Sequence, residues 1–205
     1  MITEQVAARG LTDPLVLEAL RRVPRHRFAR EEDARDVYRD RALPIGFGQT
    51  ITQPYVVALM THALGIGPTS RVLEVGTGSG YQAAVLAEIT SEVYSIEIVP
   101  ELAHRAQRLF TDLGYRHLRT RIGDGSHGWA DEGPYDAILV TAAPTCVPRP
   151  LFDQLAPGGK MCVPVGPHFG KQELLIVEHS LNGTMRTREL STVRFVPMTG
   201  EAATY

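Results

Sequence analysis

Between Arg71 and Thr141 the sequence alternates short apolar runs with amphipathic segments, and this alternation constrains the fold more than any other feature. It predicts strands over Arg71–Val75, Val93–Glu97, His117–Ile122 and Tyr135–Thr141, with helices over Tyr81–Thr90 and Pro100–Leu113. Strands that alternate with helices form βαβ units, in which neighbouring strands run parallel. We therefore predict an α/β fold with a ligand at the carboxyl ends of its strands.

The two flanks of this region have different patterns. Asp13-Pro14 supplies an N-cap and a first-turn proline, which predicts a helix from there, and a second helix is predicted to begin near Thr52-Gln53-Pro54. Near the other end, Asn182-Gly183 separates two strand-like runs, Leu174–Glu178 and Met185–Val193. Asn-Gly between such runs is the strongest short hairpin signal, so the sheet is expected to end in an antiparallel pair.

Length and composition favour one domain. The chain has 205 residues, 43% hydrophobic and 21% charged, as is typical of a globular protein. We predict a single domain over 1–205, with a helical, substrate-side segment over 1–65 and a ligand-binding mixed sheet of about seven strands over 66–205.

Charge and hydropathy argue against several classes of partner. The net charge of −2 gives no basic surplus for a nucleic-acid backbone. The start, Met1–Arg9, lacks the pattern of a signal peptide, and no run approaches the roughly 18 apolar residues of a membrane span. The histidines and the two cysteines share no metal-ligand spacing. We expect a cytoplasmic protein without nucleic acid, membrane or metal.

The glycine-rich turn after the first strand indicates where a ligand binds. Gly76-Thr77-Gly78-Ser79-Gly80 follows Arg71–Val75 and opens the next helix. Glycines there allow positive φ and close approach of a ligand, and the helix N-terminus favours an anionic group. A dinucleotide fingerprint would require a third glycine at position 81, where the chain has Tyr81, which counts against NAD.

Two acidic residues follow the next strands. Glu97 closes the second strand, and a carboxylate there can accept both hydroxyls of a ribose, which NAD and S-adenosylmethionine share. Asp124 follows the third strand and can accept from an adenine amino group. Singly, Glu97 reads as a solvated charge and Asp124 as a turn residue. Together with the glycine turn, at three successive strand ends, they favour an adenosine site.

At this point the sequence resembles the protein-L-isoaspartate (D-aspartate) O-methyltransferases over nearly its whole length. The resemblance rests on Leu43–Pro54 (LPIGFGQTITQP), on Val72–Gly80 with Tyr81-Gln82-Ala83-Ala84, and on shorter matches at Gly123-Asp124-Gly125, Pro134–Ile138, Leu155–Gly159 and Phe195-Val196-Pro197. It implies a Rossmann-like class I fold that uses S-adenosyl-L-methionine and releases S-adenosyl-L-homocysteine. The implied activity is methylation of the α-carboxyl of L-isoaspartyl residues in damaged proteins and peptides, which initiates repair through a succinimide.

The resemblance also implies the site residues. Those expected to hold the cofactor are Gln49, Thr50, Ile51, Thr52, Gly76, Thr77, Gly78, Ser79, Glu97, Ile98, Gly123, Asp124 and Thr199. Thr52 matches the position where the family usually carries a serine regarded as the active-site hydroxyl. Small side chains and backbone groups near Thr52, Ala142, Ala143 and Val196 are expected to hold the substrate.

Thr52 has a structural alternative, because a threonine just before Gln53-Pro54 is also a good N-cap. Three functional alternatives remain beside the repair enzyme. The first is a carboxyl methyltransferase for one dedicated peptide or small molecule, with the same cofactor. The second is a non-catalytic module that binds adenosine ligands, and the third is an NAD dehydrogenase.

Overall fold

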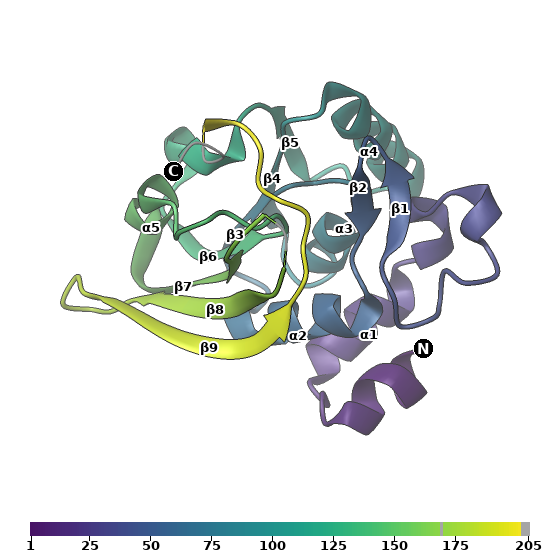
Figure 1. Ribbon diagram of the computed structural model, residues 1–205, viewed down its shortest axis with the longest axis horizontal. Coiled ribbons are helices and arrows are strands. Elements are labelled where there is room, and N and C mark those ends of the chain that lie inside the picture. Colours follow the sequence, from purple (N-terminus) through teal and green to yellow (C-terminus); the bar gives the residue numbers. More distant parts are fainter. Residues whose placement is uncertain (169, 202–205) are drawn as a thin grey trace.

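A central sheet organises the protein, and four of its strands, between Arg71 and Val140, lie in the region where alternation predicts them. The computed structural model describes residues 1–168 and 170–201. Within this part, the sheet consists of β3 (Arg71–Val75), β4 (Glu92–Glu97), β5 (Arg119–Ile122), β6 (Tyr135–Val140), β7 (Leu155–Val165), β8 (Gln172–His179) and β9 (Met185–Val193). Their order across the sheet is β5-β4-β3-β6-β7-β8-β9 (Figure 1).

The directions of the strands create a switch point. β3 pairs in parallel with both β4 and β6. The chain continues from β3 to β4 and β5 on one side of it and then crosses to β6 on its other side. β8 and β9 are antiparallel additions at one edge, joined through Gly183 with φ +81°. The predicted mixed sheet of about seven strands with a terminal antiparallel hairpin is confirmed. A crevice at the carboxyl ends of β3 and β6 is where such a sheet binds a ligand.

Helices cover the sheet on both faces. The larger helices are α1 (Pro14–Arg22), α2 (Pro54–Leu64), α3 (Tyr81–Ala87), α4 (Pro100–Leu113) and α5 (Arg149–Asp153). Short helical turns occupy Ile2–Val6, Ala7–Arg9, Arg25–Phe28, Glu31–Asp33, Gly125–His127 and Ala130–Glu132. Among the described helices, none has the length and apolar character needed to cross a bilayer.

Alternating residues of β3 enter two different cores. Val72 belongs to a cluster with residues of α1 to α4, including Leu20 and Phe110, whereas Leu73 belongs to a second cluster with Phe152 of α5. Val6 also lies in the first cluster, so residues 1–65 share their core with the sheet. Burial on both faces also explains the nearly continuous apolar run of β6.

The helix boundaries follow from local chemistry. Asp13 caps α1 as predicted, because its Oδ1 accepts the N–H groups of Leu15 at 3.0 Å and Val16 at 3.4 Å. α4 has the predicted bounds, and its end at Gly114 has φ +85°. α3 ends at Ala87 rather than at the predicted Thr90.

A small hairpin outside the main sheet was not predicted. It consists of β1 (Leu43–Gly46) and β2 (Gln49–Ile51), which pair antiparallel. The turn uses left-handed backbone at Phe47, with φ +54°, and at Gly48, with φ +71°. Figure 1 shows the hairpin beside the sheet, with the yellow segment that follows β9 running near β2. The hairpin therefore brings residues 49–52 to the ligand-binding end.

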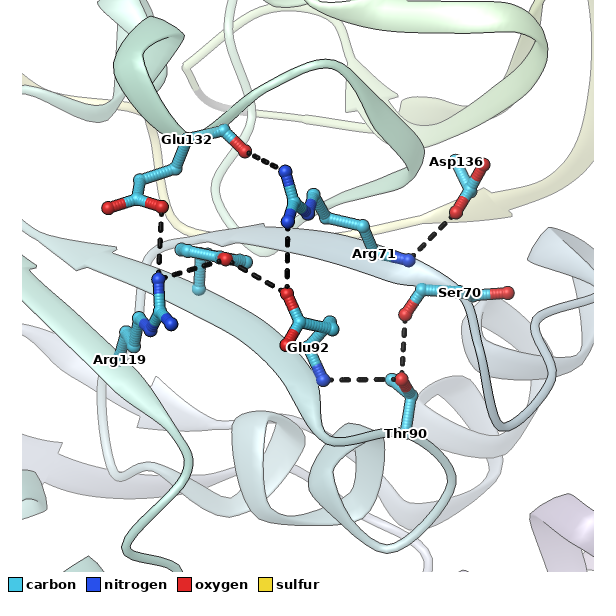
Figure 2. Close-up of polar contacts among 8 residues, drawn as sticks. Ser70, Arg71, Thr90, Glu92, Arg119, Glu132 and Asp136 are labelled. Atoms are coloured by element: carbon cyan, nitrogen blue, oxygen red, sulfur yellow. Dashed lines mark hydrogen bonds and ion pairs between the residues drawn. The ribbon is translucent and has the colours of Figure 1, made fainter.

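The opposite end of the sheet carries a polar network (Figure 2). Arg71 at the start of β3 donates to Glu92 at 3.2 Å and to the Glu132 carbonyl at 3.1 Å, and its N–H donates to Asp136 at 2.8 Å. Arg119 of β5 pairs with Glu132 at 3.0 Å. These contacts join the amino ends of neighbouring strands and leave the carboxyl ends free for a site.

Candidate active site

A cavity lies at the carboxyl ends of β3, β4 and β6, and we call it the cofactor cavity. Distant parts of the chain line it together, among them the end of the β1–β2 hairpin, the glycine turn after β3, the end of β4 and the segment after β9. The predicted residues in its lining are Gln49, Thr50, Ile51, Thr52, Gly76, Thr77, Gly78, Ser79, Glu97, Ile98, Ala142, Val196 and Thr199. Sequence reasoning thus placed most of the lining residues, although they come from distant segments.

The glycine turn requires glycine for a specific reason at position 76. Gly76 has φ +95°, and a Cβ there would lie 2.3 Å from Oγ1 of Thr141. That hydroxyl donates to the Gly76 carbonyl at 2.6 Å and to the Val75 carbonyl at 3.0 Å, which locks β6 against the turn. Any larger residue at position 76 would break this packing, so the turn keeps its shape only with glycine.

Glu97 lies at the end of β4 and is held in one orientation. The side chain is only 5% exposed. Its Oε2 accepts the Gly78 N–H at 2.7 Å, and its Oε1 accepts the Val99 N–H at 2.9 Å. Each carboxylate oxygen has a second lone pair, so both can still accept a hydroxyl from a ligand. This geometry fits the predicted contact with a ribose.

A buried polar chain supports the turn from behind. Oγ1 of Thr77 lies 2.5 Å from Oγ of Ser95, and Ser95 in turn donates a short hydrogen bond to Glu74. Burial raises the pKa of Glu74 to about 8, with the hydrogen bond from Ser95 opposing the shift and the charge of Glu97 adding to it. Glu74 therefore holds a proton at neutral pH, which leaves Glu97 as the nearby negative charge.

The chemistry of the lining suits a positively charged ligand. Among the described residues, Glu97 is the single charged side chain in the lining, and the other polar side chains are hydroxyls and amides. A sulfonium or ammonium group is attracted by such a carboxylate and meets no cation there. S-adenosylmethionine, whose sulfur is positively charged, fits these residues.

Thr52 does not cap α2, so that alternative is wrong. The N-cap is Gln53, without a side-chain cap bond, and Asp40 accepts the Tyr55 N–H at 2.8 Å instead. Within the described residues the Thr52 hydroxyl has no hydrogen-bond partner, and the half-buried side chain lines the cavity. The hydroxyl is therefore free for a ligand.

Arg25 fixes the backbone of Thr52. This arginine is fully buried, and it donates to the carbonyl of Thr52 through Nη2 and to that of Val37 through Nε, both at 2.8 Å. Its guanidinium lies 4.7 Å from the centre of the Tyr81 ring, which also lines the cavity. Burial lowers the pKa of Arg25, and Tyr81 and Asp40 oppose that shift. An arginine stays charged even so, and it joins the two walls of the cavity.

The predicted adenine end looks different. Gly123 and Asp124 lie outside the described lining, which includes Gly125. Oδ1 of Asp124 accepts the Ser126 N–H at 2.9 Å, and Oδ2 accepts the Glu201 N–H at 2.7 Å. Partial burial alone would raise the pKa of Asp124, but these backbone donors outweigh it and the pKa is lowered. Asp124 binds the C-terminal segment here, and its contact with adenine stays a prediction.

Ala143 is also placed differently from the prediction. It is fully buried and lies outside the cavity lining. Its N–H donates to the Val196 carbonyl at 2.8 Å, and its carbonyl accepts the Met198 N–H at 2.8 Å. Both backbone groups therefore attach the C-terminal segment. This placement gives no support to the expected contact between Ala143 and the substrate, which stays a prediction.

Several lining residues were not predicted. Among them are Tyr81, Gln82, Gly125 and Met198. Thr141 stands at the end of a predicted strand, and that position is a usable signal for a site. Tyr81, Gln82 and Gly125 lie in motifs that carry the family resemblance, whereas nothing in the sequence marks Met198, because its approach depends on how the C-terminal segment packs.

The switch-point cavity, the glycine turn and the strand-end carboxylate define a Rossmann-like methyltransferase of class I. Solved structures agree with this class. A protein-L-isoaspartate O-methyltransferase superposes with a TM-score of 0.88 at 28% identity, over 98% of this chain and 67% of that one. A putative protein-L-isoaspartate O-methyltransferase from Plasmodium falciparum, in complex with S-adenosyl-L-homocysteine, has a TM-score of 0.83 at 25% identity, over 97% and 96%.

Sequence comparisons identify the family. The family model described as protein-L-isoaspartate (D-aspartate) O-methyltransferase matches residues 1–203. Protein-L-isoaspartate O-methyltransferase 2 of Syntrophobacter fumaroxidans is 52% identical over 97% of this chain and 80% of its own. Protein-L-isoaspartate O-methyltransferase of Gloeobacter violaceus is 51% identical, over 98% of both chains. The chain belongs to the protein-L-isoaspartate (D-aspartate) O-methyltransferase family, and it is an S-adenosylmethionine-dependent enzyme.

Proposed function

We propose that this protein methylates the α-carboxyl of L-isoaspartyl residues in damaged proteins and peptides, and that Thr52 is its catalytic hydroxyl. Membership of the family, and relatives with 51% and 52% sequence identity that carry its name, support this reaction. The observation that carries the assignment of Thr52 is its unbonded hydroxyl in the wall of the cofactor cavity.

The reaction needs positioning more than acid–base chemistry. S-adenosylmethionine, when bound, supplies a methyl group on a positively charged sulfur. An α-carboxyl has a pKa of about 3.3–3.7 and is ionised at neutral pH, so no general base is needed. The described lining accordingly contains hydroxyls and no histidine. Holding the two reactants in line contributes about 7–11 kcal/mol in favourable cases.

Thr52 suits the orientation of a carboxylate. A hydroxyl can donate to one carboxylate oxygen and leave the other free to form the new bond to the methyl carbon, as the carbon–sulfur bond breaks. Among the described lining residues there is no arginine or lysine, either of which would hold the carboxylate more firmly and make it a weaker nucleophile. Ala142 and Val196 line the same cavity, which supports the prediction that they contact the substrate backbone.

Formation of a methyl ester accounts for repair. The ester makes the α-carbonyl carbon a better electrophile than the carboxylate. The backbone nitrogen of the next residue can then attack this carbon, and methanol leaves. The resulting succinimide opens with water to aspartyl or isoaspartyl peptide, so repeated cycles enrich the normal linkage. We expect the substrates to be damaged proteins of varied sequence, and the predicted place of action stays the cytoplasm.

Substitutions at Thr52 test the proposal. Thr52→Val keeps the shape and removes the hydroxyl, whereas Thr52→Ser keeps the hydroxyl and removes a methyl group. A hydrogen bond to a charged group contributes about 1.5–3 kcal/mol, so kcat for an isoaspartyl peptide should fall about 10- to 150-fold in Thr52→Val and change little in Thr52→Ser. Affinity for S-adenosylhomocysteine, from calorimetry, should be kept in both variants.

The controls separate catalysis, substrate class and folding. Aspartyl peptides of identical sequence should not be methylated, and thermal melting should show that both variants are folded. Equal kcat in wild type and Thr52→Val would remove Thr52 from the mechanism. Failure of several unrelated isoaspartyl peptides, with turnover of one dedicated carboxylate, would favour the alternative of a narrow carboxyl methyltransferase.

A further inference from the structure

A second hollow lies beside the cofactor cavity, and we call it the basic groove. It has a volume of about 330 Å³. Its lining includes Thr50, Thr52, Val56, Lys171, Arg194 and Phe195. Thr50 and Thr52 also line the cofactor cavity, so the two hollows share this wall. Whatever occupies the groove therefore lies next to the hydroxyl proposed to orient the reacting carboxylate.

Among the described residues that line the groove, the two charged ones are both cations. Lys171 precedes β8 and Arg194 follows β9, and both side chains are exposed. Neither makes an ion pair or a side-chain hydrogen bond within residues 1–168 and 170–201. Nearby arginines of the N-terminal segment differ, because Arg9 pairs with Asp40 at 3.0 Å and Arg41 pairs with Asp36. The groove thus presents two uncompensated positive charges.

Among the described residues, no acidic side chain forms an ion pair with these cations. Asp40 accepts from Gln53 of the groove at 2.7 Å, but its carboxylate is also engaged by Arg9 and by the Tyr55 N–H. Glu173 stands opposite Thr192 on the neighbouring strand and lies outside the lining. A ligand with negative charge is therefore favoured over one with positive charge.

From these features we infer that the basic groove binds the segment that flanks the isoaspartyl residue, and that Lys171 and Arg194 favour acidic side chains in that segment. The inference rests on the proposed function. Val56, Val193 and Phe195 supply half-buried apolar surface for the stems of those side chains. The enzyme accepts many sequences through contacts with the backbone, and the two cations rank those sequences by charge.

A peptide series tests the inference. Three peptides share one isoaspartyl residue and carry glutamate, glutamine or lysine at the flanking positions on both sides. Exposed ion pairs contribute modestly, so each favourable contact should raise kcat/KM about two- to fivefold. The glutamate peptide should therefore have the highest kcat/KM, the glutamine peptide an intermediate one and the lysine peptide the lowest. The order should weaken at high salt, which screens exposed charges.

Charge-reversal variants identify the residues. Lys171→Glu combined with Arg194→Glu should reverse the order of the three peptides. Arg186→Glu is the matched control, because Arg186 is exposed, lies at the other end of β9, and should leave the order unchanged. Thermal melting confirms that each variant is folded.

The outcomes separate this inference from the proposed function. Equal kcat/KM for the three peptides, or an unchanged order in the double variant, would overturn the charge preference while the methyl transfer itself stands. Absence of methylation on all three peptides by the wild type would overturn the proposed function, and this inference with it.

Discussion

Replacement of Glu74 by glutamine is expected to flatten the pH dependence of folding stability. Glu74 is fully buried in β3 and accepts a hydrogen bond from Ser95, and its Oε1 has no partner within the described residues. Burial raises its pKa from the ordinary 4.5 to about 8, with Ser95 opposing and Glu97 adding to the shift. The folded protein therefore holds a proton that the unfolded chain releases.

The sign and size follow from this difference. A carboxyl with a raised pKa in the folded state contributes stability that is complete below the unfolded pKa and is lost as the pH rises toward the folded pKa. With values of 4.5 and about 8, the two-state expression gives a loss of about 2–3 kcal/mol between pH 5 and 7. Glutamine keeps the shape of the protonated acid and has no proton to lose.

Urea unfolding at several pH values measures this effect. The free energy of unfolding of Glu74→Gln, relative to wild type, should rise by about 2–3 kcal/mol from pH 5 to pH 7. Glu189→Gln controls for the loss of an exposed carboxylate on β9. Parallel curves for wild type and Glu74→Gln over this range would refute the reasoning, because they would mean that folding does not perturb the ionisation of Glu74.

Two further substitutions test the packing around the site. Arg25→Met leaves the buried carbonyls of Val37 and Thr52 without their donor, which should cost about 1–3 kcal/mol of folding stability for each carbonyl. It should also lower kcat, because the Thr52 backbone is no longer held, while the affinity for S-adenosylhomocysteine is kept. The control is Arg27→Met, in the same helical turn but exposed, which should match wild type in urea unfolding and in turnover. Gly80→Ala places a Cβ 2.8 Å from the Phe110 ring at φ +90°, whereas Gly114→Ala at φ +85° meets nothing within 4 Å. Both variants should lose about 1–2 kcal/mol of the free energy of unfolding, because alanine is strained in left-handed backbone. Gly80→Ala should lose more than Gly114→Ala in urea unfolding, because its Cβ also meets Phe110. Equal losses would contradict the tight contact with Phe110.

The fold was predictable where local signals agree with tertiary packing. Asp13-Pro14, the helix before Gly114 and the hairpin at Gly183 each carry a strong local signal, and each lies where the sequence places it. β7 was missed because Pro157-Gly158-Gly159 reads as a turn, although the structure incorporates it in a strand with a shifted register against β6. The β1–β2 hairpin was missed because its strands are short and interrupted by proline and glycine.

The site was predictable only in part, for a related reason. The glycine turn and Glu97 follow strands directly, so their place at the rim comes with the sheet. Asp124 also follows a strand, but a Cβ at Gly200 would lie 2.3 Å from its carboxylate, which shows how closely the C-terminal segment packs there. Contacts with a segment some 75 residues away leave no local pattern, and the same holds for Ala143.

The wall at Thr50 and Thr52 suggests a route to inhibitors. A single compound that carries an adenosyl group at one end and an acidic peptide at the other, joined by a linker that passes these two threonines, would engage both hollows together. Tethering gives the second end an effective concentration of about millimolar for a short, well-matched linker. Two weak ligands joined in this way would bind tightly, and selectively against methyltransferases that lack a cationic groove beside the cofactor.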